Sequence, residues 1–125
     1  MSAKDEKVGL RIDIGHDWRA KKPDPPNPKQ QLNWNTEVIG GVPNYFHREE
    51  IKFKKNEFRS LPKITLGIFG LSIETGKPVG PHEERASIAL HVENPSKDGF
   101  TLLIKSWGKE NAIRDVGFSW IAIED

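Results

Sequence analysis

Short runs in which apolar and polar residues alternate are the feature that most constrains the fold of this chain. Successive side chains of a β-strand point to opposite faces, so a period of two is typical of a strand with one buried side. Segments rich in Gly, Pro, Asn and Asp separate the runs, and no segment shows a convincing helical period. The runs lie at residues 9–15, 35–43, 49–53, 63–76, 85–94, 100–107 and 112–123. The pattern predicts an antiparallel β-sandwich or small barrel of six or seven strands.

The first run and the segment after it differ in character. "GLRIDIG" (9–15) places Leu10, Ile12 and Ile14 on one face and Arg11 and Asp13 on the other. This alternation is typical of a half-buried strand. Residues 21–30 contain four prolines. Because proline has no N–H for a β-ladder, we expect a loop or an edge segment there.

Composition narrows the possible functions. A chain of 125 residues with 35% hydrophobic and 30% charged residues suits one small globular domain. Its 19 basic and 18 acidic residues are scattered, for a net charge of +1, so we expect no nucleic-acid groove and no membrane surface. There is no Cys and no apolar leader in "MSAKDEKVG". We expect a flexible segment at 1–8, a single domain at 9–125, and a cytoplasmic protein or one secreted by a non-classical route.

Trp107 lies off the apolar face of its run. In "FTLLIKSWGK", Phe100 and Ile104 share one face, whereas Trp107 shares the other with Leu103. One interpretation is that a partner chain or the N-terminal segment covers this second face, which Leu103 favours. The other is that the ring is a flat platform at the rim of the sheet, of the kind that packs against the C–H face of a sugar. Trp120 lies on the apolar face of the last run, so we expect it in the core.

The remaining candidate constellations favour structural roles. The chain has four histidines without metal-ligand spacing, so we expect no metal site and no cofactor: His16, His47, His82 and His91. The acidic pairs lie in loops, at edges and at the C-terminus, which favours solvated charges over a catalytic pair. No nucleophile elbow or phosphate loop is present, so we expect no enzyme. Trp18 and Trp34 flank the proline-rich loop, and either packs against the sandwich or closes a sugar cleft.

Two long stretches carry a family resemblance: "EEIKFKKNEFRSLPKITLGIFGLSI" and "NPSKDGFTLLIKSWGKENAIRDVGFSWIAIED". They contain an I-x-F segment, a Pro before an apolar strand, a Gly-Phe strand that ends in Trp, and a closing W-I-A. These elements are Ile51, Phe53, Pro62, Gly99, Phe100, Trp107, Trp120, Ile121 and Ala122. Their order and spacing resemble the H-type lectin family. "RIDIGHDW" (11–18) resembles the opening strand of that family, so the resemblance spans roughly residues 9–124.

The resemblance implies an all-β fold, a six-stranded antiparallel β-sandwich. It implies protomers that associate as homotrimers, sometimes stacked into homohexamers. The implied ligand is galactose or N-acetylgalactosamine on glycans, bound without a metal at clefts between protomers, so the protein would act as a multivalent agglutinin. An alternative from another class is a non-catalytic structural or adhesion domain that trimerises and has lost sugar binding.

The strand residues of the family site carry over as follows. The Trp that ends the Gly-Phe strand is Trp107. The family Arg matches Arg85 if the turn before Gly99 holds two extra residues, and Ser87 if it does not. Arg85 and Ser87 share a face, so the implied site includes either.

The loop residues of the family site are less direct matches. Gly108 stands where the family has a His, so we expect Lys109 or Asn111 to supply the missing hydrogen-bond donor. This departure argues against specificity for N-acetylgalactosamine. It also supports the alternative function as a domain without sugar binding. The loop after the N-terminal Trp implies an acid and a partner, which are Asp24 and Asn27 here.

Overall fold

The computed structural model describes residues 10–54, 58–73, 87–108 and 113–124. Within these residues the chain forms seven strands and one short 3-10 helix. They are β1 (Arg11–Ala20), η1 (Pro28–Gln30), β2 (Asn35–Ile39), β3 (Val42–Lys52), β4 (Lys63–Ile73), β5 (Ser87–Glu93), β6 (Gly99–Trp107) and β7 (Ile113–Glu124). In the part of the chain that the structure describes, no helix is long and apolar enough to cross a membrane.

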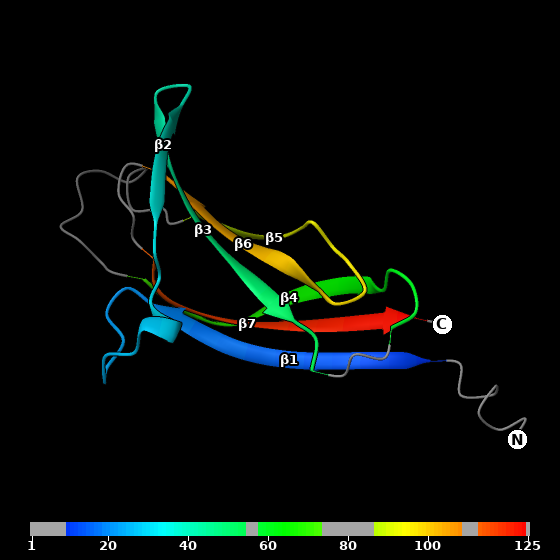
Figure 1. Ribbon diagram of the computed structural model, residues 1–125. Helices are drawn as coiled ribbons and strands as arrows, with labels where there is room; N and C mark the ends of the chain where they lie inside the picture. The colour runs from blue at the N-terminus through cyan, green and yellow to red at the C-terminus, as the bar shows by residue number, and fades with distance from the viewer. Residues whose placement is uncertain (1–9, 55–57, 74–86, 109–112, 125) are drawn as a thin grey trace, which may run out of the picture.

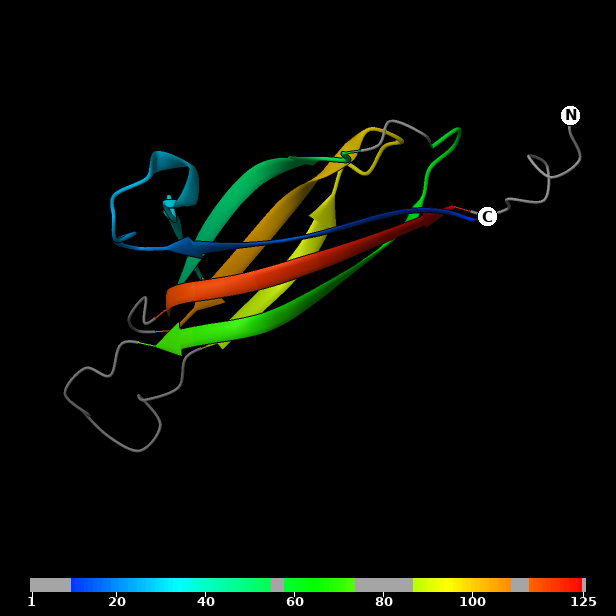
Figure 2. The same ribbon diagram turned by 90° about the horizontal axis from the view of Figure 1, so that it is seen from below.

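The strands form two antiparallel sheets that face each other. One sheet has three strands in the order β1-β7-β4, and the other has four in the order β2-β3-β6-β5. Figure 2 shows the three-stranded sheet in front of the four-stranded one, and Figure 1 shows the β2–β3 hairpin extending beyond both. The predicted antiparallel β-sandwich is therefore confirmed. The described strands number seven, which is within the six or seven that the pattern predicts and is one more than the resemblance implies. A turn at Gly40 and Gly41 separates β2 from β3, so β3 begins earlier than the predicted run at 49–53.

The core fills the space between the sheets. Alternate residues of β6 and β7 point inward, and partly buried residues of β4 and β5 pack against them. The buried cluster consists of Leu32, Ile51, Phe53, Phe58, Phe100, Leu102, Ile104, Ile113, Val116, Phe118, Trp120 and Ala122. The expected core position of Trp120 is thus confirmed, and Trp34 also packs against this cluster. Both outcomes follow from the burial of large apolar surface.

β1 runs further than the predicted strand, and its buried side is the polar one. Asp13 and Gly15 are buried, whereas Ile12 and Ile14 are exposed on the outer face. The cause is Trp120, which pairs with Gly15 in register and whose indole occupies the space that a Cβ of Gly15 would need. Its Nε1–H donates to Oδ2 of Asp13 at 3.2 Å. The strand is confirmed, and its apolar side faces outward.

The outer face of the three-stranded sheet therefore carries exposed isoleucines. Ile12 pairs with Ile123, and Ile14 pairs with Ile121. These four side chains, here termed the aliphatic patch, are between 37% and 61% exposed. Large apolar side chains that gather on one face usually mark an interaction surface.

Candidate functional site

Trp107 is the last residue of β6 and lies on the outer face of the four-stranded sheet. Phe100, Leu102 and Ile104 of the same strand point into the core, so the period of two directs Trp107 outward. Its side chain is 36% exposed. The chain turns away immediately afterwards, where Gly108 adopts a φ of 132° and donates its N–H to the Pro43 carbonyl at 3.2 Å. The ring thus lies at a rim where a ligand can approach it.

Three polar residues surround this ring. Ser87 of β5 and Asn44 of β3 both pair with Trp107 in register, one on each side. The Nζ of Lys105 lies 5.5 Å from the Trp107 ring centroid and 5.8 Å from that of Phe46. Lys105 is absent from the predicted site, although the strand period places it on the same face as Trp107. The rim therefore combines an aromatic surface with an ammonium and a hydroxyl.

Leu103 bears on the interpretation that a partner chain covers this second face. It lies between Arg48 and His91 in the sheet register, and only 6% of it is exposed in the single chain. Neighbouring side chains of the same sheet therefore account for its burial. An apolar residue at this position does not require a partner protomer.

The structure brings together three of the predicted site residues: Trp107, Ser87 and Gly108. Arg85, Lys109 and Asn111 lie outside the described residues. The two loop residues lie elsewhere in this chain. Asp24 lines a hollow on the three-stranded sheet beside Trp18, and Asn27 lines a different hollow between β1, η1 and β3. One protomer therefore does not bring both loop residues into one hollow.

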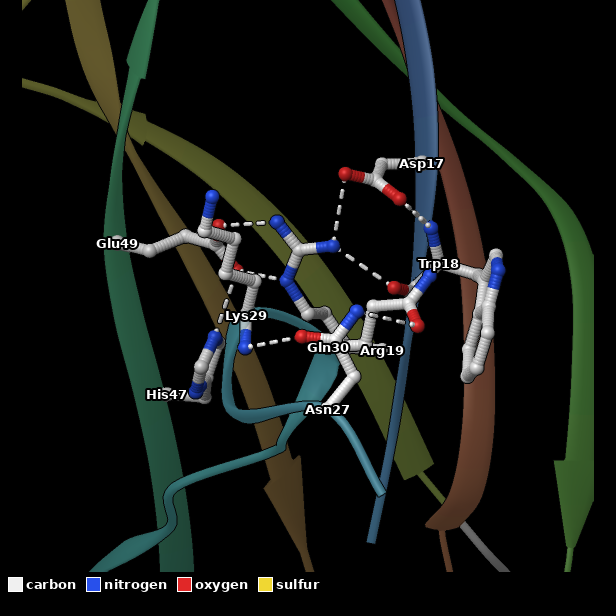
Figure 3. Close-up of polar contacts among 8 residues, drawn as sticks. All are labelled: Asp17, Trp18, Arg19, Asn27, Lys29, Gln30, His47 and Glu49. Atoms are coloured by element: carbon white, nitrogen blue, oxygen red, sulfur yellow. Dashed lines mark hydrogen bonds and ion pairs between the residues drawn. The ribbon is translucent and has the colours of Figure 1, made fainter. Parts of the chain in front are cut away.

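A buried ion cluster lies next to Asn27 (Figure 3). Arg19 of β1 donates from Nε to Oε1 of Glu49 on β3 at 2.7 Å, and from Nη2 to Oε2 at 2.5 Å. Its Nη1 donates to the Trp18 carbonyl at 2.7 Å and lies 2.9 Å from Oδ2 of Asp17. The guanidinium also lies 5.4 Å from the Phe118 ring centroid. These contacts link β1 of one sheet to β3 of the other. The sequence did not predict them because Arg19 and Glu49 are thirty positions apart.

His47 completes the cluster in a defined tautomer. The backbone N–H of Asn33 donates to Nδ1 of His47 at 3.0 Å, so Nε2 carries the proton and lies 2.8 Å from Oε1 of Glu49. Burial acts to raise the pKa of the Glu49 carboxyl. The hydrogen bonds from His47 and Arg19 and the charge of Arg19 outweigh burial, so this pKa lies below its usual range.

Asn27 has a local structural role within the same hollow. Its Oδ1 accepts the Lys29 backbone N–H at 3.0 Å, which caps η1, and its Nδ2 donates to Oε1 of Gln30 at 3.3 Å. The hollow has a volume of about 480 Å³ and is lined by Asp17, Arg19, Asn27, Lys29, Gln30 and Glu49. Because the Arg19 guanidinium is engaged by Glu49, Asp17 and Trp18, this cluster connects strands rather than offering strong donors to a ligand.

No group of three or more His, Cys, Asp and Glu side chains within the described ranges could hold a metal ion. The described side chains at the Trp107 rim offer hydrogen bonding, stacking and charge. These are the interactions that hold neutral polar ligands in shallow sites.

Comparison with known proteins agrees with this fold. A family model described as the H-type lectin domain matches residues 48–123, which include β6 and Trp107. Two solved structures of discoidin II from Dictyostelium discoideum, one recombinant and one wild-type, each match with a TM-score of 0.64 and 21% identity. The matches cover 94% of this chain but 38% and 37% of the discoidin II chains, so this chain spans less than half their length. No curated protein sequence matches the chain.

Proposed function

Because the chain belongs to the H-type lectin family, we propose that it is a carbohydrate-binding lectin without catalytic activity. The ligand we propose is terminal galactose or N-acetylgalactosamine on glycans. The observation that carries the proposal is the partly exposed ring of Trp107 at the rim of the four-stranded sheet. A flat ring offers apolar contact to the C–H face of a sugar, and the groups beside it offer hydrogen bonds to its hydroxyls.

The polar groups at the rim indicate the strength of binding to one sugar. The Ser87 hydroxyl both donates and accepts, and the Lys105 ammonium donates. Gly108 has a φ of 132°, a conformation that residues with a Cβ rarely adopt, so the family His has no equivalent there. Lys105, together with Lys109 or Asn111, supplies donors in its place. Since a hydrogen bond contributes a net of about 0.5–1.5 kcal/mol, we expect a monosaccharide Kd on the order of 0.1–1 mM.

We further propose that the protein works as a homotrimer or homohexamer with sites at the clefts between protomers. The aliphatic patch supports this, because four exposed isoleucines on one sheet face suit contact with another copy. A loop from a neighbouring protomer would bring Asp24 or Asn27 to Trp107, which a single chain does not do. Three or more sites would raise apparent affinity for a dense glycan surface by roughly 10²–10⁴-fold.

A glycan array tests the proposal. The labelled protein should bind a defined set of glycans that carry terminal galactose or N-acetylgalactosamine. Trp107→Ala should lower the array signal at least about tenfold, because the apolar contact with the sugar ring is lost. Leu61→Ala is the matched control, since Leu61 is 59% exposed and lies just before β4, which belongs to the other sheet. Equal signals from the wild-type protein and Trp107→Ala would refute the proposed site.

A second candidate function is a trimeric assembly or adhesion domain without sugar binding. The φ of Gly108 favours this alternative. A histidine would rarely adopt that backbone conformation, so the His of the family site does not fit at this position. A blank array from a folded oligomer would support this alternative. Cell agglutination separates the two functions, since it requires both multivalency and sugar binding.

A further inference from the structure

We infer that the chain has a second saccharide site, in the hollow between Trp18 and Phe69 on the outer face of the three-stranded sheet. This hollow has a volume of about 480 Å³, within the range of small-molecule sites. It lies on the opposite sheet from Trp107. The inference rests on the proposed function for the class of ligand, and Asp24 is the one residue that both proposals name, so the test below does not use it.

Two glycines in adjacent strands leave room for aromatic rings at the hollow. Trp18 of β1 pairs with Gly117 of β7, and Gly117 pairs with Gly70 of β4. A β-bulge at this point adds Phe69 to β4, and the Phe69 ring reaches over Gly117, where a Cβ would come within 2.7 Å of Cζ. The Phe69 ring therefore covers Gly117, and the Trp18 side chain extends from the strand position paired with this glycine. Both rings are open to a ligand, with Trp18 38% and Phe69 60% exposed.

Polar side chains from three segments form the rim. The Lys21 N–H donates to the Arg114 carbonyl at 2.9 Å, which fixes the start of the proline-rich loop against β7. The charged and hydroxyl groups around the hollow are Lys22, Asp24, Ser72, Arg114 and Asp115. Two carboxylates and two cations are balanced, so the rim has no net charge to favour an anion or a cation. It offers both donors and acceptors next to aromatic rings.

A sugar is the ligand class that fits these features together. Its C–H face packs on an aromatic ring, and its hydroxyls need fixed donors and acceptors. The aliphatic patch on the same sheet lacks both rings and charged groups. From Ile14 of the patch to Trp18 is four residues, or about 13 Å along β1, with His16 and Ser119 paired between them. The hollow and the patch are therefore adjacent but chemically distinct surfaces.

The test uses the four tryptophan indole N–H signals of the full chain labelled with ¹⁵N. Each signal is assigned by substituting one Trp at a time, and galactose, N-acetylgalactosamine, glucose and mannose are titrated separately into the protein. We expect at least one of these sugars to shift the Trp18 signal saturably. Phe69→Ala and Asp115→Asn should each raise the Kd reported by Trp18 by about tenfold. Leu61→Ala, which is matched to Phe69 in exposure at 59% against 60%, should leave that Kd unchanged.

The outcomes at Trp18 and Trp107 separate this inference from the proposed function. A shift at Trp107 with none at Trp18 overturns the second site and leaves the proposed function intact. A shift at Trp18 that persists in Trp107→Ala supports the second site, even where the Trp107 rim binds nothing. A Trp18 shift that disappears in Trp107→Ala overturns it, as does a silent Trp18 with all four sugars. If Phe69→Ala lowers the oligomeric mass in sedimentation, the aromatic residues belong to a protomer contact and the second site is also overturned.

Discussion

Gly15 shows how one residue sets the packing of β1. The Trp120 indole occupies the position of a Gly15 Cβ, and this same indole donates to Asp13. We expect Gly15→Ala to displace the indole and weaken that hydrogen bond, at a cost of about 1–3 kcal/mol in unfolding free energy. Urea denaturation measures the loss. Gly70→Ala is the control, because nothing lies within 4 Å of a Cβ added there; equal losses in the two variants would contradict this account.

Glu49 makes the stability of the folded protein depend on pH in the acidic range. Its pKa in the folded state lies below that in the unfolded chain, which is about 4.3. Between the two values the unfolded chain binds more protons, so stability rises with pH there. The contribution of Glu49 is complete above about pH 4.3 and is lost as the pH falls through the folded-state pKa.

We therefore expect Glu49→Gln to be less stable than the wild-type protein at pH 7 and to lose less stability on acidification. Unfolding free energies from urea titrations at pH 7, 5, 4 and 3 measure both effects. Glu50→Gln, on the exposed side chain next in sequence, should keep the wild-type dependence on pH. An unchanged acid slope in Glu49→Gln would rule out Glu49 as its source.

At the scale of strands, two Arg–Glu pairs of similar geometry differ in burial. Arg19 and Glu49 join β1 to β3 across the two sheets, and the Arg19 side chain is 8% exposed. Arg48 and Glu93 join β3 and β5 of one sheet, with Nε and Oε1 2.8 Å apart, and the Arg48 side chain is 51% exposed. We expect Arg19→Met to cost about 3 kcal/mol, because the largely buried Glu49 carboxylate loses its cationic partner and keeps only the hydrogen bond from His47. Arg48→Met should cost much less, since solvent screens that pair. Chemical denaturation of both variants measures the difference, and equal costs would show that the Arg19 cluster does not hold the sheets together.

The strands also show which features a sequence of this kind can predict. β5, β6 and β7 lie within about two residues of their predicted bounds, because each has one face in the core and an alternating pattern results. β2 is exposed throughout, so burial imposes no alternation on it. In β1 the apolar residues occupy the outer face, and only the space needed by the Trp120 indole explains why Gly15 faces inward.

The candidate site likewise contains residues that the strand pattern predicts and residues that it does not. Strand parity alone predicts the outward position of Trp107 and also predicts Lys105 beside it. Only the family resemblance places Asp24 and Asn27 in one site. In the fold they line separate hollows, because the proline-rich loop spans two faces of β1. The Arg19–Glu49 pair joins different sheets, so no local pattern reveals it.

At the scale of the whole molecule, the distribution of exposed apolar residues suggests how copies meet. The aliphatic patch, Trp18 and Phe69 all lie on the outer face of the three-stranded sheet, whereas the four-stranded sheet carries the Trp107 rim. Contact through the aliphatic patch would leave the rims of several copies accessible to one glycan surface. This arrangement would allow the avidity that weak single sites require.

Charging the aliphatic patch should therefore separate the protomers without unfolding them. We expect the wild-type protein to sediment at a multiple of the 14.2 kDa chain mass, and Ile14→Lys to sediment as a single chain. Ile14 is 61% exposed in the protomer, so lysine is tolerated by the fold but not by an apolar contact. Ile39→Lys, at a position 49% exposed on β2, should keep the wild-type mass. A wild-type protein of 14.2 kDa, or identical masses for the wild-type protein and Ile14→Lys, would refute a protomer contact through the patch. If Ile14→Lys is a folded single chain, its signal on a glycan array should fall by about 10²–10⁴-fold. Its monosaccharide Kd should weaken as well, because the proposed sites need a loop from the neighbouring protomer. An unchanged monosaccharide Kd would instead indicate that each site is complete in one chain.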